Sequence, residues 1–164
     1  MTQRRIQLKV TAQSDLPHHD AEADIETERW RRLAELALEA ENISEGELAL
    51  FFINEEIMTD LNTEHMGENG PTDVLAFPID GPTQGTTKTT TDPDGPPQIL
   101  GDIFICPSVA RKNADIYKKP FEDEIALLVI HGVLHILGHD HAEDEEKRIM
   151  QEREKVLLAH HYQS

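Results

Sequence analysis

Several features that define common protein classes are missing from this sequence. Cys106 is the single cysteine in 164 residues, so no internal disulfide can form, which agrees with a reducing compartment. No apolar run is long enough to span a bilayer, and no apolar segment follows Met1. There is also no internal repeat and no boundary for a second domain. We therefore expect one soluble, cytoplasmic domain over residues 1–164 that does not associate with membranes.

Basic residues are scarce as well. The chain has 15 Lys and Arg against 32 Asp and Glu, which gives a formal net charge of −17. Nucleic-acid affinity normally depends on Lys and Arg that neutralise phosphates, so this balance argues against broad, tight RNA binding. It leaves room for a local basic cleft, for a bound metal cation that attracts phosphate, or for delivery by a basic partner protein.

The most informative stretch that is present covers residues 121–141, FEDEIALLVIHGVLHILGHDH. Between Ile125 and Leu137 nearly every residue is apolar on all sides of a helical wheel, so a helix here is predicted to be buried. His131 and His135 interrupt it four residues apart, which places both imidazoles on one helix face. Gly138 can adopt the left-handed conformation that ends a helix.

The spacing HxxxHxxGxxH then brings His141 back toward the same point. Three neutral imidazoles suit a tetrahedral Zn²⁺ whose fourth position stays open to water, which is the arrangement of a catalytic site. The alternative is that His131 and His135 are core histidines with ordinary hydrogen-bond partners. Burying two imidazoles in so apolar a helix is costly unless they bind something, so we favour the metal site. His139 is treated as a neighbour and Asp140 as lying outside direct coordination.

Two enzyme families share this spacing. Metzincin proteases use HExxHxxGxxH with a Glu general base after the first His, but the chain has Gly132 there, so a peptidase would lack its base. The motif closely resembles the signature HGxLHLxGYDH of the YbeY family of single-strand-specific endoribonucleases. The matching residues are His131, Gly132, Leu134, His135, Gly138, Asp140 and His141.

Two further segments carry the same resemblance. Residues 61–78 resemble the family pattern LNxxYRGKDxPTDVLSFP, and residues 100–105 match its LGDIVI. In the first segment the identical residues are Leu61, Asn62, Gly67, Pro71, Thr72, Asp73, Val74, Leu75, Phe77 and Pro78. The resemblance therefore extends over about residues 45–158.

Residue patterns also predict the elements along the chain. Alternation or apolar runs predict strands over 4–10, 47–53, 74–77 and 99–106, with a polar loop over 11–23. Helices are predicted over 24–41 with Asp24 as N-cap, from Asn54 to about 64, from Pro107 to a stop at Pro120, and over about 142–160. Residues 79–98 are rich in Gly, Pro, Thr and Asp and predict a long mobile loop.

The family resemblance implies an α+β fold: one domain with a mixed sheet of about four strands, about five helices, and a metal site on a buried helix. It implies a zinc-dependent, single-strand-specific endoribonuclease of ribosomal RNA maturation and ribosome quality control, with the ribosomal small subunit or its proteins as partners. One Zn²⁺ on His131, His135 and His141 would supply the reactive water, since a bound zinc lowers its water's pKa to about 7. No protein general base is assigned.

The chain departs from the family at one position that matters for substrate binding. Met66 stands where the family has an arginine that is regarded as important for cleavage, and a guanidinium there is suited to grip a phosphate. Arg111 and Lys112 are the candidate substitutes in this sequence. If neither serves, we expect phosphodiester cleavage to be weakened or redirected.

Two other functions remain open at this point. One is a metal-dependent hydrolase of another substrate, which the missing arginine and the acidic composition suggest. The other is a non-catalytic ribosome-assembly factor in which zinc only holds the fold.

Overall fold

A computed structural model describes residues 7–80 and 98–162. The mobile loop predicted over 79–98 falls almost wholly on residues 81–97, which lie outside the described residues, as do residues 4–6 of the first predicted strand. The strands are β1 (Leu8–Ser14), β2 (Gly46–Phe52), β3 (Val74–Pro78) and β4 (Ile99–Ile105). The helices are α1 (Thr27–Ala40), α2 (Glu55–Met66), α3 (Pro107–Tyr117), α4 (Phe121–Ile136) and α5 (Asp144–His161).

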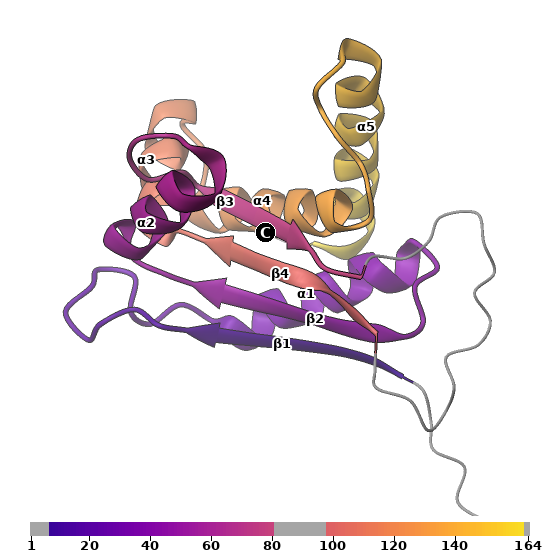
Figure 1. Ribbon diagram of the computed structural model, residues 1–164, viewed down its shortest axis with the longest axis horizontal. Helices are drawn as coiled ribbons and strands as arrows, with labels where there is room; N and C mark the ends of the chain where they lie inside the picture. Colours follow the sequence, from indigo (N-terminus) through magenta and orange to yellow (C-terminus); the bar gives the residue numbers. More distant parts are fainter. Residues whose placement is uncertain (1–6, 81–97, 163–164) are drawn as a thin grey trace, which may run out of the picture.

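The four strands form one mixed sheet in the order β1-β2-β4-β3. β1 and β2 are parallel, as are β2 and β4, whereas β3 runs antiparallel to β4. Figure 1 shows α1 and α4 behind the sheet, α2 in front of its left end, and α5 standing steeply over one end of α4, with its C-terminal part beside α4. The α+β architecture with a four-stranded mixed sheet and five helices is as predicted.

The main core lies between the sheet and the two helices behind it. Alternate residues of β2 and β4 point to this side, including Leu48, Leu50 and Ile103, and each is at most 1% exposed. α4 contributes a buried surface on almost every side, because it contacts α1, α3, α5, β3 and β4. The prediction of a buried, non-amphipathic helix here is confirmed.

A smaller core lies under α2 on the front of the sheet. Asn54 caps α2 by accepting a hydrogen bond from the backbone N–H of Ile57 at 2.9 Å, and Gly67 ends the helix in the left-handed conformation. Met58 is fully buried against Leu75 and Cys106. Ile57, the next residue along the chain towards the N-terminus, is 39% exposed.

Two predicted boundaries near the N-terminus are wrong. β1 continues to Ser14, into the stretch predicted as a polar loop, because this edge strand pairs with β2 while Thr11 and Gln13 stay exposed. Polar residues are tolerated on the exposed face of an edge strand, so the polar composition of this stretch wrongly predicted a loop. α1 begins at Thr27 rather than after Asp24, and no side chain caps it.

No helix within residues 7–80 or 98–162 combines the length and the apolar character that crossing a bilayer requires.

Candidate functional site: a histidine cleft on helix α4

The exposed side of α4 carries the histidines. α4 begins after Pro120, whose fixed backbone suits the position before a helix, and ends at Ile136. Gly138 has φ +100°, so the chain reverses where the sequence predicted. His131 and His135 lie on α4 and His141 on the segment that links α4 to α5. The fold therefore brings the three predicted ligands to one region.

Glu154 of α5 fixes the orientation of His131. The carboxylate Oε2 lies 2.7 Å from His131 Nδ1, and the Glu154 residue is only 7% exposed. A carboxylate can only accept, so Nδ1 carries the hydrogen and donates it, which leaves Nε2 free to bind a ligand. Carboxylates hold metal-binding histidines in this way.

A backbone carbonyl does the same for His135. His135 Nδ1 lies 3.1 Å from the carbonyl oxygen of His139, so its Nδ1–H donates and its Nε2 is likewise free. Burial is the main cause that lowers the pKa of His135, and the nearby His131 lowers it further. His135 is therefore neutral near pH 7, the form in which an imidazole binds a metal.

His141 completes the group from the exposed link. Its ring centroid lies 5.7 Å from that of His131 and 6.3 Å from that of His135. Two imidazoles on one tetrahedral zinc, with Zn–N bonds of about 2.0–2.1 Å, have centroids about 5 Å apart. Within the described residues, no three His, Cys, Asp or Glu side chains are already close enough to hold an ion. The donor types and the free Nε2 atoms of His131 and His135 suit zinc, and the exposed His141 lies beside both rings.

The two residues beside His141 have other partners. Asp140 uses Oδ1 to accept the backbone N–H of His141 at 2.7 Å, so it shapes the link on which His141 lies. The Nε2 atom of His139 lies 4.0 Å from a carboxylate oxygen of Glu41, and its carbonyl serves His135.

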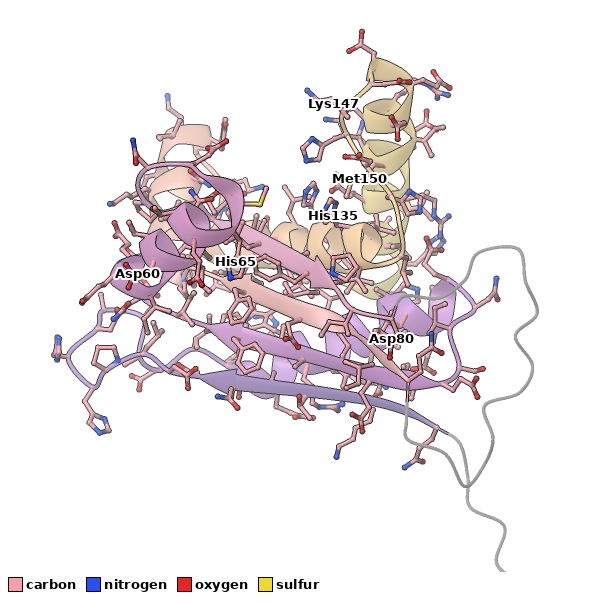
Figure 2. The ribbon with its side chains drawn as sticks, viewed as in Figure 1. Asp60, His65, Asp80, His135, Lys147 and Met150 are labelled. Atoms are coloured by element: carbon pink, nitrogen blue, oxygen red, sulfur yellow. The ribbon has the colours of Figure 1, made fainter. Side chains whose placement is uncertain are left out.

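A cleft of about 580 Å³ opens beside His131 and His141. Residues of α4 line its floor, and residues of α3 and α5, which both pack on α4, line its walls. Figure 1 shows α3 and α5 at opposite ends of α4. Figure 2 places His135 on α4 with Lys147 and Met150 above it on α5. A volume of this size is typical of a site for a small ligand or a short segment of a polymer.

A polar cluster lies on the cleft wall opposite α5. Asn113 donates from Nδ2 to Asp73 at 3.1 Å and to Glu124 at 3.3 Å, and Glu124 also pairs with Lys119 at 2.8 Å. Burial raises the pKa of Asp73, and the nearby Glu124 carboxylate adds to this effect. Asp73 therefore holds a proton to a higher pH than an exposed aspartate does.

The candidate substitutes for the family's arginine do not line this cleft. Arg111 donates to both carboxylate oxygens of Glu22, at 2.9 and 3.1 Å, and stacks over the Phe121 ring. Lys112 pairs with Glu55 at 3.2 Å. Met66, at the end of α2, is 58% exposed and is not among the cleft residues. The structure thus brings the histidines together but not the two predicted substrate-binding residues.

Gly132, the position at which a metzincin has its base, faces away from the cleft. A Cβ atom there would lie 2.8 Å from the Cγ2 methyl of Ile103 in β4. A side chain at this position would meet the sheet, so α4 packs closely here only because the residue is glycine.

Sequence reasoning missed Glu154. It lies on the buried face of α5, four residues after Met150 and three residues before Leu157. A lone carboxylate in an apolar stripe was the signal, since such a group needs a buried partner.

These features define a single-domain α+β protein with a histidine-lined cleft on a buried helix. Residues 15–162 match the family model described as Endoribonuclease YbeY. An "Endoribonuclease YbeY" of Thermobifida fusca is 44% identical over 133 residues, which is 80% of this chain and 83% of that protein. The protein of the same name from Frankia casuarinae is 41% identical, over 84% of this chain and 68% of its own length.

More distant comparisons agree. The Halalkalibacterium halodurans protein described as Endoribonuclease YbeY is 35% identical over 88% of this chain and 92% of its length. The solution structure of a Thermotoga maritima protein shares the fold, with a TM-score of 0.58, 24% identity, and coverage of 93% of this chain and 87% of that one. The chain belongs to the YbeY family.

Proposed function

We propose that this protein is a zinc-dependent endoribonuclease that cleaves single-stranded RNA. The observation that carries the proposal is the way His131 and His135 are held. Both Nδ1 atoms are occupied by acceptors, at 2.7 and 3.1 Å, so both Nε2 atoms are free on one side of α4 near His141. Membership of a family whose relatives are named Endoribonuclease YbeY supports RNA as the substrate.

Each residue of the proposed site has its own role in catalysis. His131, His135 and His141 would hold the zinc, and Glu154 keeps His131 aligned. Zinc bound by three imidazoles supplies a water of pKa about 7 and a Lewis acid that polarises a phosphoryl oxygen. Asp73 lies on the same cleft and, because burial raises its pKa, is the group suited to give a proton to the departing oxygen.

Single strands fit this site better than duplexes. The cleft lies between α3 and α5 and, at about 580 Å³, has room for a short stretch of an extended strand. Sequence-independent binding to long RNA is disfavoured by the net charge of −17. We therefore expect the protein to contact only a short stretch of RNA and to depend on the zinc ion for this binding.

The biological role that we propose is ribosomal RNA maturation and ribosome quality control in the cytoplasm. This part rests on the family resemblance, and the acidic surface is compatible with it. A surface of this charge suits basic partners, such as proteins of the ribosomal small subunit, which would bring the RNA to the cleft.

The chemical proposal is tested with purified protein and one RNA sequence in single-stranded and duplex form. We expect cleavage of the single strand only, and loss of both zinc and cleavage in His135→Ala. The matched control is His139→Ala, which keeps the carbonyl that His135 needs, and it should retain zinc and activity. Zinc lost in His139→Ala but kept in His135→Ala would overturn the ligand assignment.

The same assay separates the rival functions. Faster hydrolysis of small phosphoesters or peptides than of RNA would favour a hydrolase of another substrate. Undiminished RNA processing in cells that carry only His135→Ala, with precursor ribosomal RNA measured by blotting, would favour a non-catalytic assembly factor. Our proposal predicts that precursors accumulate in those cells.

A further inference from the structure

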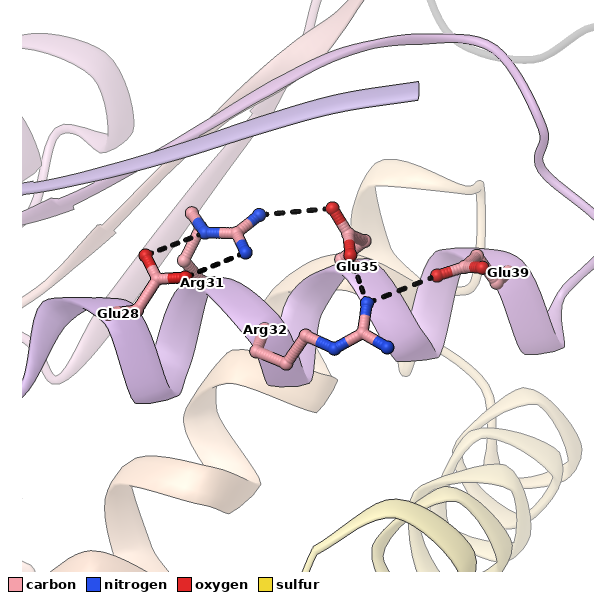
Figure 3. Close-up of polar contacts among 5 residues, drawn as sticks. All are labelled: Glu28, Arg31, Arg32, Glu35 and Glu39. Atoms are coloured by element: carbon pink, nitrogen blue, oxygen red, sulfur yellow. Dashed lines mark hydrogen bonds and ion pairs between the residues drawn. The ribbon is translucent and has the colours of Figure 1, made fainter. Parts of the chain in front are cut away.

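Most basic side chains in residues 7–80 and 98–162 are tied to carboxylates. On α1, Arg31 pairs with Glu28 and Glu35, and Arg32 also reaches Glu35 and Glu39 (Figure 3). The other basic residues in ion pairs are Arg29, Arg111, Lys112, Lys119, Arg148 and Arg153. Those with no carboxylate within ion-pair distance in the described part of the chain are Lys9, Lys118, Lys147 and Lys155.

Of these unpaired lysines, Lys147 alone lines the cleft. It is exposed on α5, on the stretch of that helix that rises above α4, where Figure 2 labels it beyond Met150. Lys119, the other cleft cation, is held 2.8 Å from Glu124. In so acidic a chain, a lysine beside the histidines that no described carboxylate neutralises is suited to bind an anion.

The opposite wall presents an aromatic ring. Tyr117, the last residue of α3, lines the cleft and is 70% exposed. No ring contact or hydrogen bond holds its side chain within the described residues. Leaving so large an apolar face in water is unfavourable, and an exposed ring at the edge of a cleft is suited to stack on another planar group.

We propose that Tyr117 and Lys147 form an RNA-binding subsite on the two walls of the cleft, in which Tyr117 stacks on an unpaired base and Lys147 binds a neighbouring phosphate. This inference rests on the proposed function and deepens it. The subsite explains how the protein binds a single strand of RNA although Met66, Arg111 and Lys112 offer no cation in the cleft. It also supports single-strand selectivity, because a base in a duplex has no free face for a side chain.

The two contacts differ in their salt dependence, which makes them separable. We would measure the affinity of a fluorescein-labelled, 2′-O-methylated single-stranded RNA by anisotropy over a range of salt concentrations. For Lys147→Gln we expect weaker binding and a log–log salt slope shallower by about 0.7, the value for one lost phosphate contact on a single strand. For Tyr117→Leu we expect binding about five- to a hundredfold weaker with an unchanged slope.

Matched controls come from neighbouring residues outside the cleft. Lys155→Gln removes another unpaired lysine of α5, and Ile116→Ala removes an apolar side chain of α3 that is 71% exposed; both should bind as the wild type does. Lys147→Arg and Tyr117→Phe should preserve affinity, because charge and ring remain. The labelled RNA as a duplex should bind more weakly to the wild type and lose nothing in Tyr117→Leu.

The outcomes distinguish the two proposals. Wild-type affinity and salt slope in both Lys147→Gln and Tyr117→Leu, with cleavage intact, would overturn the subsite and leave the proposed function standing. A wild-type protein that neither binds nor cleaves the RNA would overturn both. Equal losses in Lys155→Gln and Lys147→Gln would show only a general charge effect and would also overturn the subsite.

Discussion

Removing the carboxylate of Glu154 should weaken binding of the proposed zinc, although Glu154 is not one of the proposed ligands. Its hydrogen bond to His131 Nδ1 is 2.7 Å long and lies in a nearly buried position. A hydrogen bond to a charged group contributes about 1.5–3 kcal/mol, and loss of such a partner lowers metal affinity about 10- to 100-fold. We expect that loss in Glu154→Leu and a smaller one in Glu154→Gln, whose amide oxygen still accepts from Nδ1.

The assay is competition for zinc with a chromophoric chelator, together with thermal unfolding of the metal-free proteins. The control is Glu152→Gln, which removes an exposed carboxylate of the same helix that pairs with Arg148. It should leave the zinc affinity unchanged. If Glu154→Leu bound zinc as tightly as the wild type while its melting temperature fell, Glu154 would be a structural residue and the reasoning about His131 would be refuted.

Three other changes test the packing and the cleft. Burial raises the pKa of Asp73 above 3.8, so ionising this carboxyl lowers the free energy of unfolding as pH rises through the raised pKa. In urea unfolding at neutral pH, Asp73→Asn should therefore be more stable than the wild type. Below about pH 4 this advantage should be gone, because Asp73 is then protonated in both the folded and the unfolded state. Equal stability at all pH values would contradict this. Gly132→Ala should lower the melting temperature, because the added methyl overpacks against Ile103 at a cost of about 1–3 kcal/mol. The better helix propensity of Ala offsets about 1 kcal/mol of that cost. An unchanged melting temperature would mean that α4 moves away from Ile103 to accommodate the methyl group. Met66→Arg puts a guanidinium at the exposed end of α2, outside the residues that line the cleft, and should speed single-strand cleavage by no more than about tenfold; a gain of about a hundredfold would show that this position reaches the phosphate.

Local patterns were enough to predict the part of the site that lies within one segment. The spacing of His131, His135 and Gly138, in a run too apolar to face water, predicted both the buried helix and its turn. Proximity in sequence determines these relations, so no knowledge of the tertiary structure was needed. The mixed sheet came from the family resemblance, because strand order depends on contacts between distant segments.

The parts that escaped prediction depend on contacts between segments. Glu154 lies 23 residues after His131, and only the packing of α5 on α4 brings the two together. Arg111 looked available in the sequence, but the fold places Glu22, 89 residues away, against its guanidinium. β1 extended into a polar stretch because its pairing with β2, which no local pattern encodes, overrides composition.

The central claim is that one zinc ion on His131, His135 and His141 is required for RNA cleavage. The most direct measurement is to strip the purified protein with a chelator and add zinc in steps, recording bound zinc and cleavage of a single-stranded RNA in the same samples. We predict no cleavage without zinc, and recovery that follows zinc occupancy and saturates at one ion per chain. Full cleavage by the metal-free protein, or zinc bound at one equivalent with no recovery of cleavage, would contradict it.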